Sequence, residues 1–182
     1  MDVTANDVIE FWYSERIKKQ WFASSPELDN EILQNYEQCW QQAFAGELDH
    51  WGETAEGVLA LIIVLDQLPL NMFRGTARSF QSEAKSIEIA HDAIAKQFDQ
   101  QLEKQQLAFL LMPFMHSEKL DDQDLSVALF EEHGLDNNLR FARHHRDIIR
   151  RFGRFPHRNE ILGRDSSEEE LKYLNSAEAF KG

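Results

Sequence analysis

Hydrophobic residues recur along this chain at intervals of three and four, the spacing of one face of an α-helix. Thr4 can cap a first helix, because its side chain can accept the free N–H groups of the first turn. Ser25 and Pro26 are typical of a second helix start, and Gly46 of its end. The pattern therefore predicts helices from the first residues onward.

The most apolar part of the chain predicts a helix in the middle of the core. Thr54 can cap it, and residues 58–65 are hydrophobic almost without interruption. A helix that is apolar all round has to be buried on every side. Pro69 is expected to end it, because proline lacks the N–H that the helix would need.

Further helices are expected at residues 82–98, 99–112, 121–132, 136–152 and 166–175. The stretch 71–80 between them is expected to be a connection.

Local signals set the ends of these later helices. Pro113 is expected to stop one helix and Gly134 to close the next. Asp136 can cap the helix that follows, and Ser166 with Glu169 has the spacing of a capping box. These signals predict an all-α fold of about seven to eight antiparallel helices, in a single domain over residues 1–182.

Composition agrees with a globular, cytoplasmic protein. Hydrophobic residues make up 42% of the chain and charged residues 28%. The single cysteine, Cys39, excludes an internal disulfide and suits a reducing compartment. The N-terminus lacks the basic start of a signal peptide. The apolar run 58–65 is far shorter than the ~20 residues of a membrane-spanning helix.

Charge is unevenly distributed. The net charge of −13 disfavours binding to nucleic acid, which needs a basic surface. Residues 139–164, however, hold eight arginines against two carboxylates, so this segment carries +6 and the remainder −19. We call residues 139–164 the basic segment.

The basic segment predicts an anion site. Arginine binds carboxylate or phosphate through a planar fork of N–H donors. The alternative is that these arginines pair with the abundant Asp and Glu side chains. Helical spacing places His145 on the core-facing stripe with Phe141, and Asp147 and Arg151 on the neighbouring stripe. Beyond the helix, Pro156 stiffens a loop rich in polar residues: Arg154, His157, Arg158 and Asn159.

Two other short stretches bring polar groups to helix ends. His116 and Glu118 follow a hydrophobic helix, where loops often carry sites. They could help to bind a metal, or simply cap the next turn. Asp66 and Gln67 follow the most apolar helix, so we expect them to be partly buried. A buried carboxylate needs a partner, and an arginine of the basic segment is the natural one.

Taken together, residues 145–159, 113–118 and 65–75 closely resemble three sequence blocks of a bacterial family of unknown function, family 924. The residues 162–164 and the Ser-x-Glu-Glu helix start at 166–169 extend the resemblance, which covers nearly the whole chain. The family implies an all-α fold similar to tetratricopeptide-like proteins and implies no activity. This chain has Leu70 where the family has arginine. It also departs from the family at residues 27–29, so Asp29 is not taken as a site residue.

The leading functional hypothesis is a shared pocket for a small carboxylate or phosphate. Its catalytic candidates are His145, His157 and Glu118. Its candidate binding residues are Asp66, Gln67, Asn71, Arg74, His116, Asp147, Arg151, Arg154, Arg158 and Asn159. A peptide-binding helical scaffold and a metal-dependent hydrolase are the alternatives. No cofactor motif is present, no membrane or nucleic-acid partner is expected, and the oligomeric state is not indicated.

Overall fold

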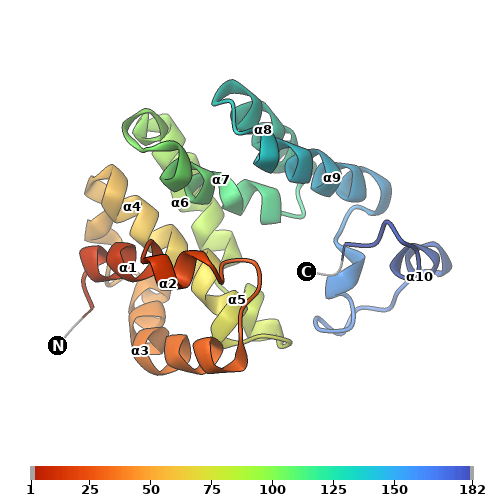
Figure 1. The fold of residues 1–182 in the computed structure, drawn as a ribbon. Coiled ribbons are helices and arrows are strands. Elements are labelled where there is room, and N and C mark those ends of the chain that lie inside the picture. The colour runs from red at the N-terminus through yellow and green to blue at the C-terminus, as the bar shows by residue number, and fades with distance from the viewer. Residues whose placement is uncertain (1–2, 181–182) are drawn as a thin grey trace.

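The computed structural model describes residues 3–180, and within them the chain is all helical, as predicted (Figure 1). Residues 1 and 2, which entered the reasoning about the N-terminus, lie outside the described residues. The α-helices are α1 (Ala5–Trp12), α2 (Glu15–Lys18), α3 (Pro26–Ala45), α4 (Ala55–Ile62), α5 (Leu68–Met72), α6 (Glu83–Ala95), α7 (Lys104–His116), α8 (Leu120–Glu132), α9 (Asp136–Phe152) and α10 (Glu168–Leu174).

Short helical turns connect these elements. The 3-10 turns are η1 (Asp49–Glu53), η3 (Ala77–Phe80), η4 (Phe98–Gln101) and η5 (Pro156–Arg158). One turn of π-helix, η2 (Ile63–Gln67), joins α4 to α5 without a break. The predicted connection 71–80 thus holds the end of α5 and the turn η3.

The central helix is α4 with its extension through η2 and α5. It packs against α1, α3, α6 and α7, and the side chains from Leu59 to Leu65 are at most 1% exposed. The window Ala55–Met72 is long and apolar enough to span a membrane, with a mean hydropathy of 1.4, but 83% of it is buried inside the fold. Its burial is that of a core helix, as the sequence predicted.

The C-terminal part forms a second, smaller unit of packing (Figure 1). Helices α8 and α9 pack side by side, and α7 contacts both. Beyond α9 the chain turns through η5 and ends near α10. Here Ile148, Ile149, Phe155 and Tyr173 form a core separate from the main one. The likeness to tetratricopeptide-like proteins stays a prediction.

Several predicted helix ends are confirmed. Thr4 and Thr54 accept backbone N–H groups of the turns that follow them, and Ser25 does the same before Pro26. Gly46 adopts a left-handed conformation with φ 87°, which glycine adopts without steric cost. These residues end or begin helices because they satisfy backbone groups that the helix leaves free.

Both proline predictions are wrong. Pro69 lies in the first turn of α5, a position that tolerates its missing N–H. The π turn before it joins α5 to α4, with Leu68 N–H bonded to Ile63 O. Pro113 lies inside α7, and the helix continues to His116. This extra turn places His116 on a helix that belongs to the main core.

Smaller corrections concern α9 and α10. The capping box of α10 is formed by Ser167 and Glu170, one residue later than predicted. Asp136 is the first residue of α9, and Leu135 precedes the helix in the capping position. Phe141 was expected on the core-facing stripe, but it is 56% exposed.

Candidate functional site

A carboxylate and an imidazole meet beneath the end of α7. Asp66 Oδ1 lies 3.0 Å from His116 Nδ1, and the side chain of Asp66 is only 2% exposed. Gln67 Nε2 donates to the other oxygen, Asp66 Oδ2, at 2.6 Å. Three of the residues predicted from two separate stretches of sequence are therefore in contact.

The π turn η2 supplies Asp66 and Gln67. A π turn inserts an extra residue into a helix, and such turns are rare and often found at functional sites. Here the turn brings two adjacent polar side chains into a region surrounded by Ile63, Val64 and Leu65, which are at most 1% exposed. The sequence gives no signal for the π turn, because its hydrophobic pattern is that of a continuous helix.

One ring nitrogen of His116 is hydrogen-bonded, and the other is not. Nδ1 contacts Asp66, while Nε2 has no hydrogen-bond partner among the described residues, and the side chain as a whole is 19% exposed. Burial opposes a charged imidazole, but the charge and hydrogen bond of Asp66 outweigh it, with help from the charge of Glu83. The pKa of His116 is therefore raised above its usual value.

Arg158 approaches the same place from the turn η5. Its side chain is 7% exposed; Nη1 lies 2.9 Å from Glu83 Oε2, and Nη2 donates to His116 O at 2.9 Å. The guanidinium carbon lies 4.4 Å from the ring centre of Phe80 and 4.8 Å from that of Phe155. The remaining donor, Arg158 Nε, is buried and has no partner. Such a buried donor without an acceptor requires an explanation.

Glu83 completes this cluster, and the sequence analysis missed it. It is the first residue of α6, which is an ordinary position for an acidic side chain because it faces the positive end of the helix. Burial raises the pKa of Glu83, and the positive charges of Arg158 and His116 offset only part of that rise. We call Asp66, Glu83, His116 and Arg158 the central cluster.

A second network lies on the other side of Phe155. Arg164 donates to both oxygens of Glu118, at 2.7 and 2.9 Å, and Phe155 N–H donates to Glu118 at 2.8 Å. Asn159 accepts from Arg164 Nε and donates to Ser166. Burial would raise the pKa of Glu118, but these hydrogen bonds outweigh it and hold the pKa below its usual value. Glu118 is therefore a charged structural anchor for the loop and is a poor proton donor.

The two histidines predicted to be catalytic both pack against Phe180; His145 is buried and His157 is half-buried. The ring of Phe180 packs 4.4 Å from that of His145 and 5.0 Å from that of His157. His145 is 5% exposed, which confirms that it faces the core, and its Nδ1 contacts Phe141 O. Burial lowers the pKa of His145 to about 3, and burial with the charge of Arg158 lowers that of His157 to about 4.

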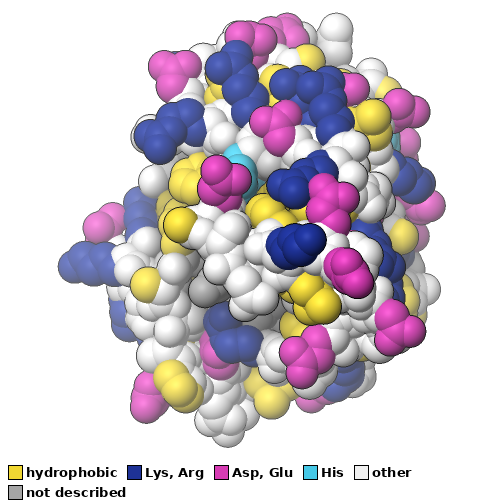
Figure 2. Space-filling model, turned by 90° about the vertical axis from the view of Figure 1, so that its right-hand side faces the viewer, with side chains coloured by type: hydrophobic (Ala, Val, Ile, Leu, Met, Phe, Trp, Pro, Cys, Tyr) yellow, Lys and Arg dark blue, Asp and Glu magenta, His cyan; other side chains and the backbone are white. Residues whose placement is uncertain are grey.

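Other predicted binding residues are engaged elsewhere. Arg154 forms two hydrogen bonds with Glu170, and Arg151 pairs with Glu169 at 2.9 Å. Asp147 is exposed on α9 and forms no hydrogen bond with another described residue. Figure 2 shows this side of the molecule, with basic and acidic side chains interleaved across it. Arg151 and Arg154 therefore pair with acidic side chains of the protein, which was the alternative to an anion site.

Asn71 and Arg74 form a separate contact with α3. Asn71 Nδ2 donates to Asp29 Oδ1 at 2.7 Å, and Arg74 Nε donates to Asp29 Oδ2 at 2.6 Å. Burial opposes ionisation of Asp29, but its bonds to Arg74, Asn71 and Ser24 lower its pKa overall. The structure places Asn71 and Arg74 with Asp29 and not with the central cluster. Asp29 was set aside in the sequence analysis, so this partner was missed.

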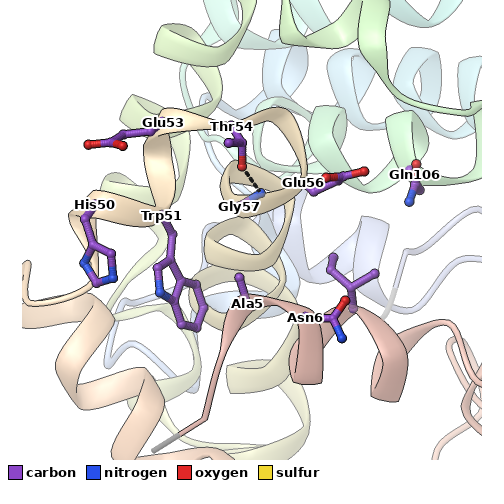
Figure 3. A pocket seen from close by; sticks show the side chains of 10 residues that line it. Ala5, Asn6, His50, Trp51, Glu53, Thr54, Glu56, Gly57 and Gln106 are labelled. Atoms are coloured by element: carbon purple, nitrogen blue, oxygen red, sulfur yellow. Dashed lines mark hydrogen bonds between the residues drawn. The ribbon is translucent and has the colours of Figure 1, made fainter.

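Two surface pockets lie away from all the predicted residues. One, of about 440 Å³, is formed by α1, η1, α4 and α7 (Figure 3). Its polar side chains include Glu53 and Glu56 beside the N-terminus of α4, where acidic residues stabilise the helix dipole, and Thr54 caps the same helix by accepting from Gly57 N–H. The other pocket follows the exposed side of α3. The acidic and capping side chains of the first pocket therefore have a structural explanation.

The described residues form no evident metal site. Within residues 3–180, no group of three or more His, Cys, Asp or Glu side chains is placed to hold a metal ion. The central cluster instead has the parts of an acid–base site. A carboxylate orients an imidazole, a guanidinium can hold an anion, and hydrophobic side chains exclude water.

Comparisons with known proteins agree with the sequence resemblance. The family model described as "Bacterial protein of unknown function (DUF924)" matches residues 8–178. A solved structure titled "Structure of Protein of Unknown Function ATU0120 from Agrobacterium tumefaciens" has 37% sequence identity and a TM-score of 0.89. The match covers 94% of this chain and 96% of that one. No curated protein matches this chain. The chain belongs to the DUF924 family of bacterial proteins.

Proposed function

We propose that this protein binds a small anionic molecule, a carboxylate or a phosphate, at the central cluster, and that His116 acts there as an acid–base group. Asp66 orients His116 through Nδ1, and Gln67 holds Asp66 in place. His116 Nε2 and Arg158 then supply N–H donors to the ligand.

The open Nε2 of His116 is the observation that carries this proposal. An imidazole that only serves the core usually has both ring nitrogens satisfied or sits against apolar groups. Here one nitrogen is fixed by a carboxylate that is 2% exposed, while the other has no partner among the described residues. In this arrangement the carboxylate sets the tautomer and stabilises the protonated ring, whose Nε2–H can then donate to an anion.

Arg158 supports the choice of an anion. Its Nε–H is buried without an acceptor, so a ligand oxygen would satisfy a donor that the protein leaves unpaired. The raised pKa of His116 adds to the positive charge available at neutral pH. Arg151, Arg154 and Arg164 hold carboxylates and have no buried side-chain nitrogen without a partner, so the proposed contact is restricted to Arg158 and His116.

Calorimetric titration of the purified protein with acetate and with inorganic phosphate tests the proposal. The variant His116→Gln should bind at least about tenfold more weakly, which corresponds to about 1.4 kcal/mol, because it loses a charged donor. The matched control is His133→Gln. His133 also contacts a buried carboxylate, Asp99, at 3.1 Å, and its side chain is 18% exposed, against 19% for His116.

Loss of binding in the His116 variant with binding kept in the His133 variant would support the proposal. Equal binding in both variants, or no binding of either anion by the native protein, would overturn it. Native mass spectrometry of the protein as purified offers an independent readout, since a retained metabolite appears as a mass adduct. We place this function in the cytoplasm, where the buried free thiol of Cys39 would stay reduced.

A further inference from the structure

Arg158 is held by several contacts, whereas the carboxylate of its partner Glu83 contacts Arg158 alone among the described residues. The rings of Phe80 and Phe155 flank the guanidinium, and the bond from Nη2 to His116 O ties it to the end of α7. Glu83 lies on the first turn of α6, and its side chain is 19% exposed. Its two oxygens contact only one guanidinium nitrogen, Nη1, at 3.1 and 2.9 Å. Glu83 can therefore move off Arg158 without breaking a hydrogen bond to any other described residue.

Building on the proposed function, we propose that Glu83 occupies the anion site in the absence of ligand, and that the ligand is a small monocarboxylate whose head group replaces the Glu83 carboxylate on Arg158. The hydrogen bonds between Glu83 and Arg158 break, and those between the ligand and Arg158 form. Glu83, displaced from Arg158 but still enclosed by the fold, takes up one proton from solvent.

The charges of the central cluster indicate a ligand with a single negative charge. When His116 is protonated, which its raised pKa favours, Arg158 and His116 carry two positive charges, and Asp66 and Glu83 carry two negative ones. If one monocarboxylate replaces the Glu83 carboxylate on Arg158 and Glu83 is protonated, the net charge of the central cluster together with its ligand stays the same. A phosphate dianion would leave one negative charge without a partner, which is costly in a buried site. The cluster therefore favours a carboxylate over a phosphate near neutral pH.

Proton uptake follows from what surrounds Glu83. The charged groups that act on it are Arg158 from η5, His116 from α7 and Asp66 from η2. Burial already raises the pKa of Glu83, and Arg158 is the cation that offsets that rise most. A ligand that takes Arg158 removes this offset, so the carboxyl binds a proton more readily. Binding of the ligand and binding of the proton then favour each other by linkage.

The variant Glu83→Gln separates this inference from the proposed function. Glutamine keeps the shape of the side chain but does not compete for Arg158 as an anion. Acetate affinity should rise about tenfold, since a charged hydrogen bond no longer has to break. The matched control is Glu88→Gln, an exposed residue on the same helix, which should bind acetate as the native protein does.

Calorimetry in two buffers of different ionisation enthalpy measures the proton. The native protein should take up as much as about one proton on binding acetate, and the Glu83→Gln variant should take up clearly less. Inorganic phosphate at about pH 7.5, where it is largely a dianion, should bind more weakly than acetate. All titrations are run at one ionic strength, because salt screens these charges.

Different results would refute the anion site, the ligand class and the role of Glu83. Acetate binding by the native protein that Glu83→Gln leaves unchanged or weakens would overturn the role of Glu83, while the anion site would stand. Tighter binding of phosphate than of acetate would overturn the ligand class. If neither the native protein nor the Glu83→Gln variant binds any of the anions, the site itself is refuted, and the role of Glu83 with it.

Discussion

The basic segment holds two kinds of arginine that the sequence does not distinguish. On the outer face of α9, Arg143, Arg150 and Arg151 pair with carboxylates while the arginine side chains stay 47–50% exposed. After the helix ends, Arg158 pairs with Glu83 at 7% exposure, and Arg154 pairs with Glu170, whose side chain is 3% exposed. The same residue type thus serves as a solvated surface pair in one place and as a buried contact in the other.

Exposed and buried pairs differ in the free energy of unfolding that is lost when one partner is removed. An exposed pair is screened by water and contributes roughly 0–1 kcal/mol to stability. A buried pair contributes little over a hydrophobic replacement, but loss of one partner leaves a buried charge and costs roughly 3–5 kcal/mol. Burial, and not the number of arginines, therefore decides where the basic segment affects stability and chemistry.

Replacement of Arg158 should give the largest loss of stability. Arg158→Met leaves Glu83 buried without its cation, and we expect a loss of about 3–5 kcal/mol in the free energy of unfolding, measured by urea denaturation. The double variant Arg158→Met/Glu83→Met removes both charges and should recover most of that loss. A double variant as unstable as the single one would show that packing between Phe80 and Phe155, and not the charge, is what Arg158 provides.

His145 should make the protein sensitive to mild acid. Its folded pKa is about 3, below the unfolded value of about 6.5, so the unfolded chain binds the extra proton and stability falls as the pH drops from 6.5 toward 3. This group alone should remove about 2 kcal/mol between pH 7 and pH 5.

Urea unfolding at these two pH values checks this effect. His145→Leu should lose clearly less stability on acidification than the native protein. His144→Leu, at the half-buried neighbouring position, should behave as the native protein does. If both variants lose stability in parallel with the native protein, His145 is not the group responsible.

Glu118 should have an intermediate effect. Glu118→Gln weakens the two bonds from Arg164 and the bond from Phe155 N–H, and a loss of about 1–2 kcal/mol at pH 7 is expected after allowance for its partial exposure. Because the pKa of Glu118 is lowered in the fold, its contribution is present above the unfolded value of about 4.3 and is lost as the pH falls below it. Thermal unfolding from pH 7 to pH 3 should show the two proteins converge; a constant gap would contradict this linkage.

Arg151 should matter least. Its pair with Glu169 has side-chain exposures of 48% and 61%, so Arg151→Ala should change the free energy of unfolding by less than about 1 kcal/mol in physiological salt. Urea denaturation at low and high salt checks this expectation. A loss as large as that of Arg158→Met would end the distinction between the two kinds of arginine.

The sequence predicted the fold well because helix signals are local. Capping residues such as Thr54 and the unbroken apolar run 58–65 determine α4 without reference to the rest of the chain. The prolines were misread because their effect depends on the turn before them. Pro69 follows a π turn whose i+5 hydrogen bond no sequence pattern indicates.

The candidate site could be predicted only in part. Asp66, Gln67 and His116 were found because polar residues at the ends of apolar helices stand out, and Arg158 because it lies in the basic segment. Glu83 was missed because it reads as an ordinary acidic residue at a helix start, and its partner lies 75 positions away along the chain. Asn71 and Arg74 were assigned to the shared pocket because no pattern in the sequence around them indicates that they hydrogen-bond to Asp29.

The central claim is that His116 and Arg158 present free donors to an anion, and nitrogen NMR of the native protein tests it most directly. Acetate added to ¹⁵N-labelled protein should shift Arg158 Nε–H and the ring nitrogens of His116 along one saturable curve. The signals of Arg154 Nε–H, whose donor already has a partner, and of His133, which lies outside the central cluster, should stay in place. Shifts that are absent at His116 and Arg158, or that are equal at all four residues, would contradict the account.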